Sequence, residues 1–468
     1  MDILLKKLIC LLPIDRTRLH QLLLVILLLS VMSKFALSIL VMIYHPNGVF
    51  EDSDSSEYHR LALNLLQHGT FSQSPRAPYE PEVLRTPAYP LILAGFYGIF
   101  GAQPVIIVFL QIALSAATIF IGFKIATVLL HEQAGLLAAL LLATDPVSIY
   151  HTQVLLTETA FTTSVSLCLL LFLHALMDPS RWHWSAGAST CLALATYIRP
   201  TSYYFGFILP LIFFIMTFPT IGWRRAAKSA LVFLSLYAVL TGGWQLHNYL
   251  QTGSIEFSQM KNRYLFVAKA AEIVAMRDDL SLEDAQQRLA SEHFQSIPPD
   301  LRAASPTRLF ESQGEYALAL IAQHPALFLW GTLKGVLASL FGPSNLSHLF
   351  GLDSVELRQS LLNGDFSKFS YRHWTMAFSS WIYGVGFLII LYLGVLLLIV
   401  RRGFFSQGMA LLLFTVLYVL VISSGPEAYS RFRLPVMPAL CVMAAAGFLH
   451  TCKTTKPEQN SQRNRAEN

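Results

Sequence analysis

Long apolar runs constrain this chain more than any other feature of its sequence. Residues 21–44, for example, form a run long enough for a helix to cross the hydrocarbon core of a bilayer, which takes about 20 residues. Hydrophobic residues make up 54% of the 468 residues and charged residues only 13%. Soluble domains carry roughly a quarter charged residues. We therefore exclude a soluble enzyme and a disordered chain, and we predict an all-α polytopic membrane protein.

The apolar runs predict about ten transmembrane helices, of which the shorter ones are tilted or trimmed differently. Two further apolar runs, residues 88–100 and 326–341, are ambiguous. The ten predicted spans are residues 21–44, 105–130, 134–150, 154–176, 184–198, 203–218, 229–246, 377–400, 404–423 and 434–450.

Charge in the short loops indicates the orientation, because Lys and Arg there favour the cytoplasmic side. With the N-terminus inside and neither ambiguous run crossing, the basic clusters of the chain all lie inside; if either run crossed alone, several of them would lie outside. These clusters include Lys6, Lys7, Arg224, Arg225, Arg401, Arg402, Lys453 and Lys456. We therefore expect a plasma (inner) membrane protein with both termini in the cytoplasm, and outer interfacial helices at 88–100 and 326–341.

This orientation divides the chain into four parts. Residues 1–246 form an N-terminal transmembrane module, whose first outer loop is 45–103. Residues 247–376 form a long extracytoplasmic segment, with the interfacial helix near 326–341 and shorter helices predicted around 281–294 and 311–323. Residues 377–450 hold the C-terminal transmembrane helices, and 451–468 a cytoplasmic tail.

The first outer loop places Asp54 at the start of an amphipathic helix that we expect to end near His68-Gly69. One interpretation makes Asp54 the helix N-cap, with Glu57 completing a capping box. The other makes Asp54 a general base held where the chain meets the outer leaflet. The sequence does not separate these two roles. Further along the loop, Arg85 precedes Pro87 and either anchors the next helix or meets an anionic headgroup.

Glu158 lies about one turn inside a predicted span, close to Asp145 and His151 in the short outer link before it. Ionisable groups at membrane depth are expensive, so a functional role is the first interpretation. A structural hydrogen bond to a neighbouring helix is the alternative. Lys34, midway along the first predicted span, is left unassigned.

Three arginines lie just outside predicted spans on the outer side, against the charge rule: Arg199, Arg431 and Arg433. The guanidinium fork binds phosphate through paired, charge-assisted hydrogen bonds. Ordinary snorkelling of each side chain to the lipid headgroups is the competing interpretation.

These residues resemble, in order, the landmarks of the glycosyltransferase C superfamily, and most closely its family 39-like bacterial members, which are related to protein O-mannosyltransferases and lipid A aminoarabinose transferases. No single motif is specific, but their order and topology together are. The matching motifs are Asp54-x-x-x-Tyr58-x-x-Leu61-Ala62, Gly69-x-Phe71-Ser72, Arg85-Thr86-Pro87-x-Tyr89-Pro90, His151, Thr157-Glu158-Thr159, Ile198-Arg199-Pro200-Thr201 and Arg431-Phe432-Arg433-Leu434-Pro435-x-x-Pro438.

The resemblance implies an enzyme that takes a sugar from a polyprenyl-phosphate carrier and transfers it, with inversion, to an extracytoplasmic glycolipid, glycan or protein. It implies that Asp54 and Glu158 are the catalytic carboxylates. It further implies that Arg85, Arg199, Arg431 and Arg433 meet the donor phosphate and that Tyr58 and His151 support the acceptor.

Two rival functions use similar residues. A transporter or flippase of an anionic lipid-linked sugar also needs outer arginines, although it typically shows paired half-repeats, which we do not find. A lipid-linked oligosaccharide polymerase or ligase shares the carrier and the arginines. No cofactor is required by the sequence, and a divalent cation held by Asp54 and neighbouring carboxylates is an option that it leaves open. No nucleic-acid partner is expected.

Overall fold

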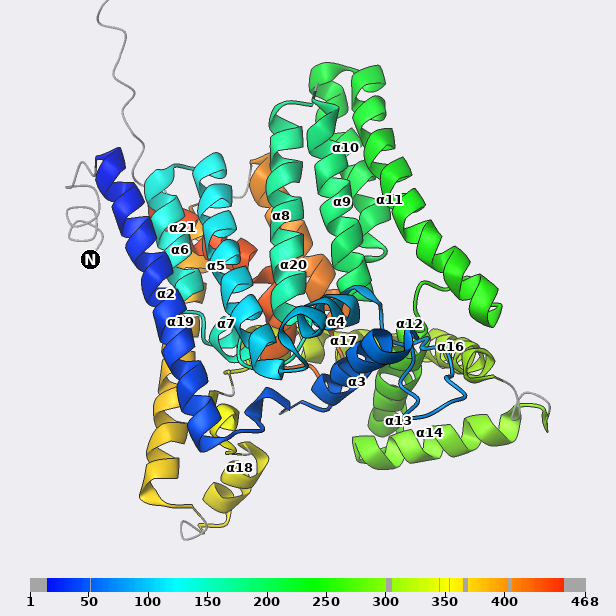
Figure 1. Cartoon of the computed structure of the whole chain (residues 1–468). Helices are drawn as coiled ribbons and strands as arrows, with labels where there is room; N and C mark the ends of the chain where they lie inside the picture. The colour runs from blue at the N-terminus through cyan, green and yellow to red at the C-terminus, as the bar shows by residue number, and fades with distance from the viewer. Residues whose placement is uncertain are drawn as a thin grey trace, which may run out of the picture.

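The computed structural model describes residues 15–50, 52–179, 181–299, 305–344, 346–352, 354–364, 369–401 and 406–449, and every regular element in them is a helix (Figure 1). Lys6, Lys7, Arg402, Lys453, Lys456 and the tail 451–468 fall outside these residues. Seven helical segments are long and apolar enough to cross a membrane, so the protein is a polytopic membrane protein. They are α2 (Arg16–Tyr44), α5 (Pro104–Leu129), α8 (Glu158–Met177), α10 (Phe205–Ile221) with the short η2 (Pro200–Ser202), α11 (Trp223–Thr252), α19 (Tyr371–Val400) and η6 (Ser430–Val436) with α21 (Met437–Leu449).

Three of the ten predicted spans are helices of fewer than 18 residues: α6 (Glu132–Ala143), α9 (Trp182–Ile198) and α20 (Gln407–Ser423). The prediction of one continuous span over 134–150 is wrong. Helix α6 ends at Ala143, and a separate short helix, α7 (Pro146–His151), follows. The break arises because Pro146 has no N–H to continue α6, while Asp145 caps α7 by accepting hydrogen bonds from the backbone N–H groups of Val147 and Ser148.

Both ambiguous runs are helices. Helix α4 (Ala88–Phe100) has the predicted limits, and Pro87 stands at its N-cap. Helix α17 (Pro325–Phe341) follows α16 (Pro306–Gln323) after one residue, at an angle of 103°. Counted together, α16 and α17 would add an eighth candidate span. Pro325 accounts for the break, because a proline starts a new helix readily but disrupts one that is already running.

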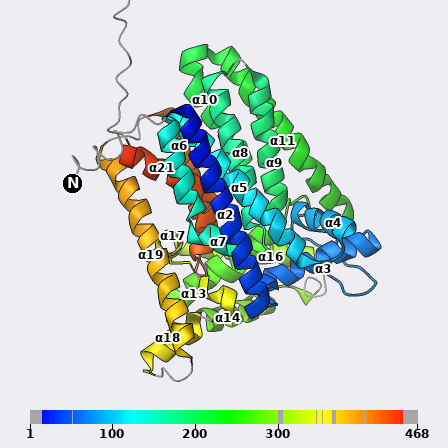
Figure 2. The same ribbon diagram turned by 60° about the vertical axis from the view of Figure 1, so that its left-hand side comes forward.

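The remaining helices gather at one end of the bundle (Figures 1 and 2). Helix α3 (Ser53–His68) ends where predicted, because Gly69 adopts the left-handed conformation (φ 65°) that terminates helices. Helix α14 (Leu282–Ser296) begins after its predicted cap, Ser281. The others at this end are η1 (Gly48–Phe50), α12 (Met260–Tyr264), η3 (Leu265–Ala270), α13 (Ala271–Asp278), η4 (Leu346–Phe350) and α18 (Ser354–Leu362).

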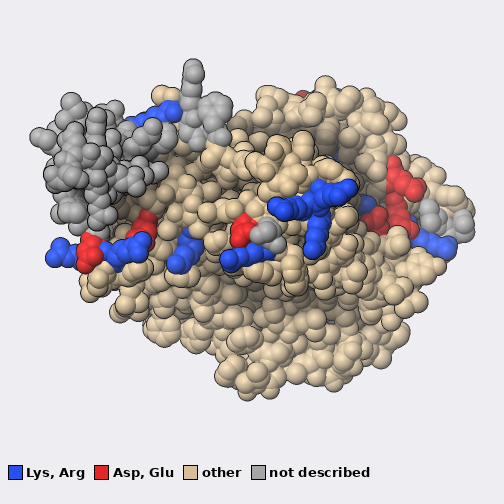
Figure 3. All heavy atoms as spheres, turned by 90° about the horizontal axis from the view of Figure 1, so that it is seen from above, with Lys and Arg blue, Asp and Glu red and all other residues tan. Residues whose placement is uncertain are grey.

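The opposite end of the bundle carries the tight turn between α10 and α11, where Arg224 and Arg225 lie in the first turn of α11. Figure 3 looks onto this end and shows Lys and Arg side chains across it. This distribution agrees with the charge asymmetry that predicts the cytoplasmic side.

Helix α21 is the centre of the bundle, since 89% of its membrane-spanning window is buried inside the protein. It packs against α19 at a contact made by two glycines. A Cβ added at Gly447 would lie 1.8 Å from the carbonyl oxygen of Gly394, and one added at Gly394 would lie 2.8 Å from Ala444. Helices in membranes associate through such close backbone contacts of small residues. The contact holds η6, the element before α21, in place.

We predict that Gly394→Ala lowers the free energy of unfolding by about 1–3 kcal/mol, because the added methyl group overpacks the contact with α21. Gly386→Ala on the same helix is the matched control: a Cβ there meets nothing within 4 Å. Unfolding in detergent, followed by circular dichroism, measures both variants. Equal stability of the two would contradict the packing role of Gly394.

Candidate active site

Four segments distant in sequence meet where the outer helices join the bundle. Asp52 and Asp54 lie at the start of α3, and Glu158 is the first residue of α8. Arg199 directly follows α9, which ends there because Pro200 cannot continue the helix. Arg431 lies in η6, the short helix that leads into α21. Helix ends therefore supply all the groups of this site.

Arg431 joins the site into one network. Its Nη1 donates to Asp52 Oδ2 at 2.9 Å and its Nη2 donates to Asp54 Oδ2 at 2.9 Å, while its Nε donates to Glu158 Oε1. The side chain is 9% exposed. One guanidinium thus binds three carboxylates, two of which lie more than 370 residues away along the chain. We call this set, with Arg199 and Arg85, the Arg431 network.

Glu158 is fully buried and accepts from two arginines on the same oxygen, Arg431 and Arg199. A buried carboxylate without a charged partner would cost several kcal/mol, so the two guanidinium groups make its ionised form tolerable. Arg199 donates to protein only through Nη1 among the described residues, and its guanidinium lies 5.6 Å from the ring centre of Phe432. It therefore keeps N–H groups free for a further acceptor.

Arg85 holds the opposite side of Asp54. Its Nη2 donates to Asp54 Oδ1 at 2.5 Å, and its Nε donates to Glu57 Oε2 at 2.8 Å. The guanidinium also lies 5.2 Å from the ring centre of Tyr58, within the range of a cation–π contact. Arg85 therefore fixes one face of Asp54 while Arg431 fixes the other.

The capping interpretation of Asp54 is wrong. Helix α3 begins at Ser53, and its N-cap is Asp52, whose side chain accepts a hydrogen bond from the backbone N–H of Asp54. Glu57 binds Arg85 rather than the helix terminus. Asp54 is therefore released from capping. Sequence reasoning missed Asp52 as a member of the site, although an aspartate directly before a predicted helix is the usual sign of an N-cap.

The two aspartates have opposite electrostatic environments. Burial raises the pKa of Asp52, and this outweighs the single favourable charge of Arg431. Burial pushes the pKa of Asp54 upward as well, but the guanidinium groups of Arg85 and Arg431 together outweigh it and hold that pKa below its usual value. Paired carboxyl groups with pKa values driven apart are typical of catalytic sites.

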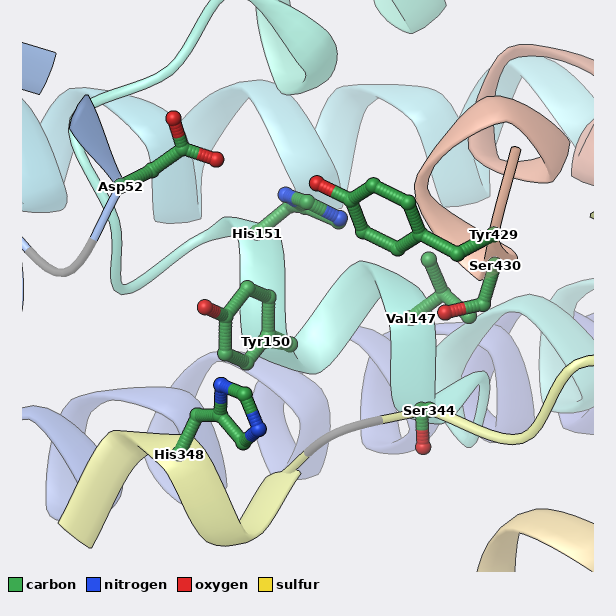
Figure 4. Close-up of a pocket in the computed structure, with 8 residues that line it drawn as sticks. All are labelled: Asp52, Val147, Tyr150, His151, Ser344, His348, Tyr429 and Ser430. Carbon is green, nitrogen blue, oxygen red and sulfur yellow. The ribbon is translucent and has the colours of Figure 1, made fainter. Parts of the chain in front are cut away.

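Two predicted supporting residues also lie at this site. Tyr58 is buried, with its ring edge-on to Tyr89 at 5.1 Å between ring centres. His151 ends α7 and is 2% exposed, and burial lowers its pKa to about 3, so its imidazole is neutral at neutral pH. His151 lines a cavity of about 220 Å³ together with Asp52 and Tyr429 (Figure 4).

Arg433 lies outside the Arg431 network. It is fully buried, and its Nη1 donates to the carbonyl oxygens of Ser339, Leu340 and Gly342. These carbonyls belong to the C-terminal end of α17, where a cation offsets the helix dipole. Of the four arginines predicted to meet a phosphate, the structure brings together Arg85, Arg199 and Arg431, and it places Arg433 on a helix terminus.

Within the described residues, no group of three or more His, Cys, Asp or Glu side chains is placed to hold a metal ion. Asp52, Asp54 and Glu158 are all bound by guanidinium groups instead. This donor set does not fit a divalent cation, and we derive no step through one.

Solved structures of known proteins share the arrangement of helices at low sequence identity. The apo oligosaccharyltransferase of Archaeoglobus fulgidus matches with a TM-score of 0.50 and 14% identity, covering 90% of this chain and 50% of that one. ArnT from Cupriavidus metallidurans bound to undecaprenyl phosphate matches with a TM-score of 0.36 and 13% identity, covering 90% of this chain and 77% of that one. At such identities the first likeness shows the fold alone, and the chain spans half the length of that oligosaccharyltransferase.

No curated protein sequence matches this chain. A family model does: residues 84–242, about a third of the chain, match the family described as dolichyl-phosphate-mannose-protein mannosyltransferase. The matched residues include Arg85, His151, Glu158 and Arg199. The resemblance predicted from the motifs is thereby confirmed, and residues 84–242 carry the sequence pattern of the dolichyl-phosphate-mannose-protein mannosyltransferase family.

Proposed function

We propose that this protein is a membrane glycosyltransferase that moves a sugar from a polyprenyl-phosphate carrier to an extracytoplasmic acceptor. The observation that carries the proposal is the Arg431 network, in which carboxylates and guanidinium groups converge at one end of a membrane bundle. The family match adds support, because that family is named for transfer of mannose from a dolichyl phosphate. The acceptor class stays open among glycolipid, glycan and protein.

The reaction needs a base and a stabiliser of anionic charge. We propose that Asp54 accepts the proton of an acceptor hydroxyl or amine as that group attacks the anomeric carbon. The bond from that carbon to the carrier phosphate breaks, and the phosphate leaves with the electron pair. Attack from the face opposite the phosphate inverts the anomeric carbon. Fixed guanidinium groups stabilise the charge that develops on the phosphate oxygens.

Arg199 is the guanidinium best suited to meet the phosphate first, because its side chain is 18% exposed and only Nη1 is used by the protein among the described residues. Arg85 and Arg431 are already bound to carboxylates. A phosphate that competes for either of them would weaken its hold on Asp54 and raise the pKa of that carboxyl group. Donor binding would then convert Asp54 from a clamped anion into a competent base.

Glu158 has a positioning role in this scheme. It is fully buried and touches Arg199 and Arg431, so it fixes the direction of both guanidinium groups. Preorganised charges stabilise a transition state without further rearrangement. The intramembrane carboxylate thus acts on the phosphate through the arginines that it holds.

Asp54→Asn should reduce sugar transfer by about 10²–10⁴-fold, the usual contribution of a general base. Its amide retains the size of the side chain, so the amount of protein in the membrane should stay normal. Transfer from a loaded polyprenyl phosphate, measured on protein reconstituted in nanodiscs, gives the rate. Asp284→Asn, at an exposed position beside the α14 cap, is the matched control. An active Asp54→Asn protein would remove Asp54 from the chemistry.

Arg431→Lys keeps a positive charge but loses the fork that binds three carboxylates, and we expect about a 10²–10³-fold lower rate of transfer. Arg433→Lys should instead lower the melting temperature, because three α17 carbonyls lose their donor, while transfer per folded molecule stays near normal. Rate and melting curve are measured on the same samples. If Arg433→Lys lost transfer with an unchanged melting curve, Arg433 would regain a role at the phosphate.

We also propose that the site faces away from the cytoplasm. A cysteine at Ser281, exposed before α14, should react with an impermeant maleimide added to intact cells. A cysteine at Arg225, exposed in the first turn of α11, should react only after the membrane is opened. Both are placed in a chain without native cysteines. The reverse pattern would overturn the orientation.

A further inference from the structure

The cavity beside the Arg431 network is large enough for a ligand and is formed by three separate segments. Its walls come from α7 (Val147 and His151), from the chain between α17 and η4 (Ser344) and from the start of η6 (Tyr429 and Ser430). Asp52 is the carboxylate of the network that reaches its lining. A ligand in this cavity would therefore lie directly beside the residues proposed to carry the chemistry.

The lining holds buried polar atoms that the protein leaves without hydrogen bonds. His151 Nδ1 and Ser344 Oγ have no hydrogen-bond partner in the part of the chain that the structure describes, although the two residues are 2% and 6% exposed. Buried polar groups are almost always paired, so an orphaned one needs an explanation. Both atoms line this cavity, and a ligand rich in hydroxyl groups would satisfy them.

The other walls present aromatic surface. In the view of Figure 4 the His151 ring lies between Asp52 and Tyr429, and Tyr150 lines the same space. Small-molecule sites combine aromatic walls with a few fixed polar groups in this way. A sugar ring has the matching chemistry, since its carbon–hydrogen faces pack on aromatic rings while its hydroxyl groups bond to polar side chains.

The size of the cavity limits what it can hold. Its volume of about 220 Å³ is smaller than the ~300–1,000 Å³ of sites that take drug-sized ligands. A single ring fits this space, whereas a chain of sugars does not.

We propose that this cavity is a subsite for one monosaccharide ring, with Asp52 and His151 as its polar anchors. The proposal rests on the proposed glycosyltransferase function and narrows its substrate: the ring is either the sugar of the donor or the terminal sugar of the acceptor. Asp52 then has two roles, since it caps α3 and binds Arg431 on one side and faces the sugar on the other.

The test compares carriers with and without a sugar on the full chain in nanodiscs. The probes are undecaprenyl phosphate, the same carrier loaded with mannose or with 4-aminoarabinose, the carrier loaded with a disaccharide, and the methyl glycosides of both monosaccharides. Val147→Phe fills the cavity from α7, and His151→Leu removes a polar anchor at similar size. Ala275→Phe, which adds the same bulk to a separate cavity bordered by α13, is the matched control.

If the ring belongs to the donor, one monosaccharide carrier should bind at least about tenfold more tightly than the bare carrier, as expected for one or two hydrogen bonds with ring packing, and a disaccharide should add nothing. Both cavity variants should abolish this gain and leave binding of the bare carrier within about twofold. If the ring belongs to the acceptor, a methyl glycoside should bind and the same variants should abolish that binding.

Sugar-dependent binding that survives Val147→Phe and His151→Leu would overturn the proposal. So would loss of bare-carrier binding in these variants, since the cavity would then hold the phosphate, and so would the absence of any sugar-dependent binding. Failure of the proposed function gives a different result, because wild-type protein would then bind no polyprenyl phosphate at all.

Discussion

The contact of one guanidinium with three carboxylates organises the functional end of this protein. Arg431 binds Asp52, Asp54 and Glu158, and each of them comes from the first residues of a helix or from the cap before it. Removing these charges from water is costly, and their mutual attraction offsets that cost only if the geometry is exact. The helix ends must therefore be placed accurately, which makes the network a constraint on the fold as well as a site.

Packing deep in the bundle provides that accuracy. The close contact between Gly394 and Gly447 fixes α21 against α19, and η6 leads directly into α21 with Arg431 in its first turn. Arg433, two residues further on, ties the same element to the end of α17 through backbone carbonyls. Two neighbouring arginines in one motif thus do different work: Arg431 gathers the acidic side chains, and Arg433 anchors the element that carries it.

The environment of Asp54 links binding to chemistry in the proposed reaction. Two guanidinium groups hold the pKa of Asp54 below its usual value, which favours the anion but makes it a weak base. An anionic donor that draws one guanidinium away would restore its basicity at the moment the base is needed. Asp52, whose pKa burial raises, faces the neighbouring cavity and is not clamped on two sides.

The sequence by itself determined the membrane character, the helix ends at Gly69, Pro87 and Pro200, and most of the charged residues of the site, because apolar length, caps and prolines act locally. It did not determine the break between α6 and α7, the capping role of Asp52 or the separation of Arg431 from Arg433. Two arginines one residue apart in a motif look equivalent in sequence. Only the tertiary structure decided which one meets Asp54, because that depends on contacts between segments hundreds of residues apart, which local patterns do not encode.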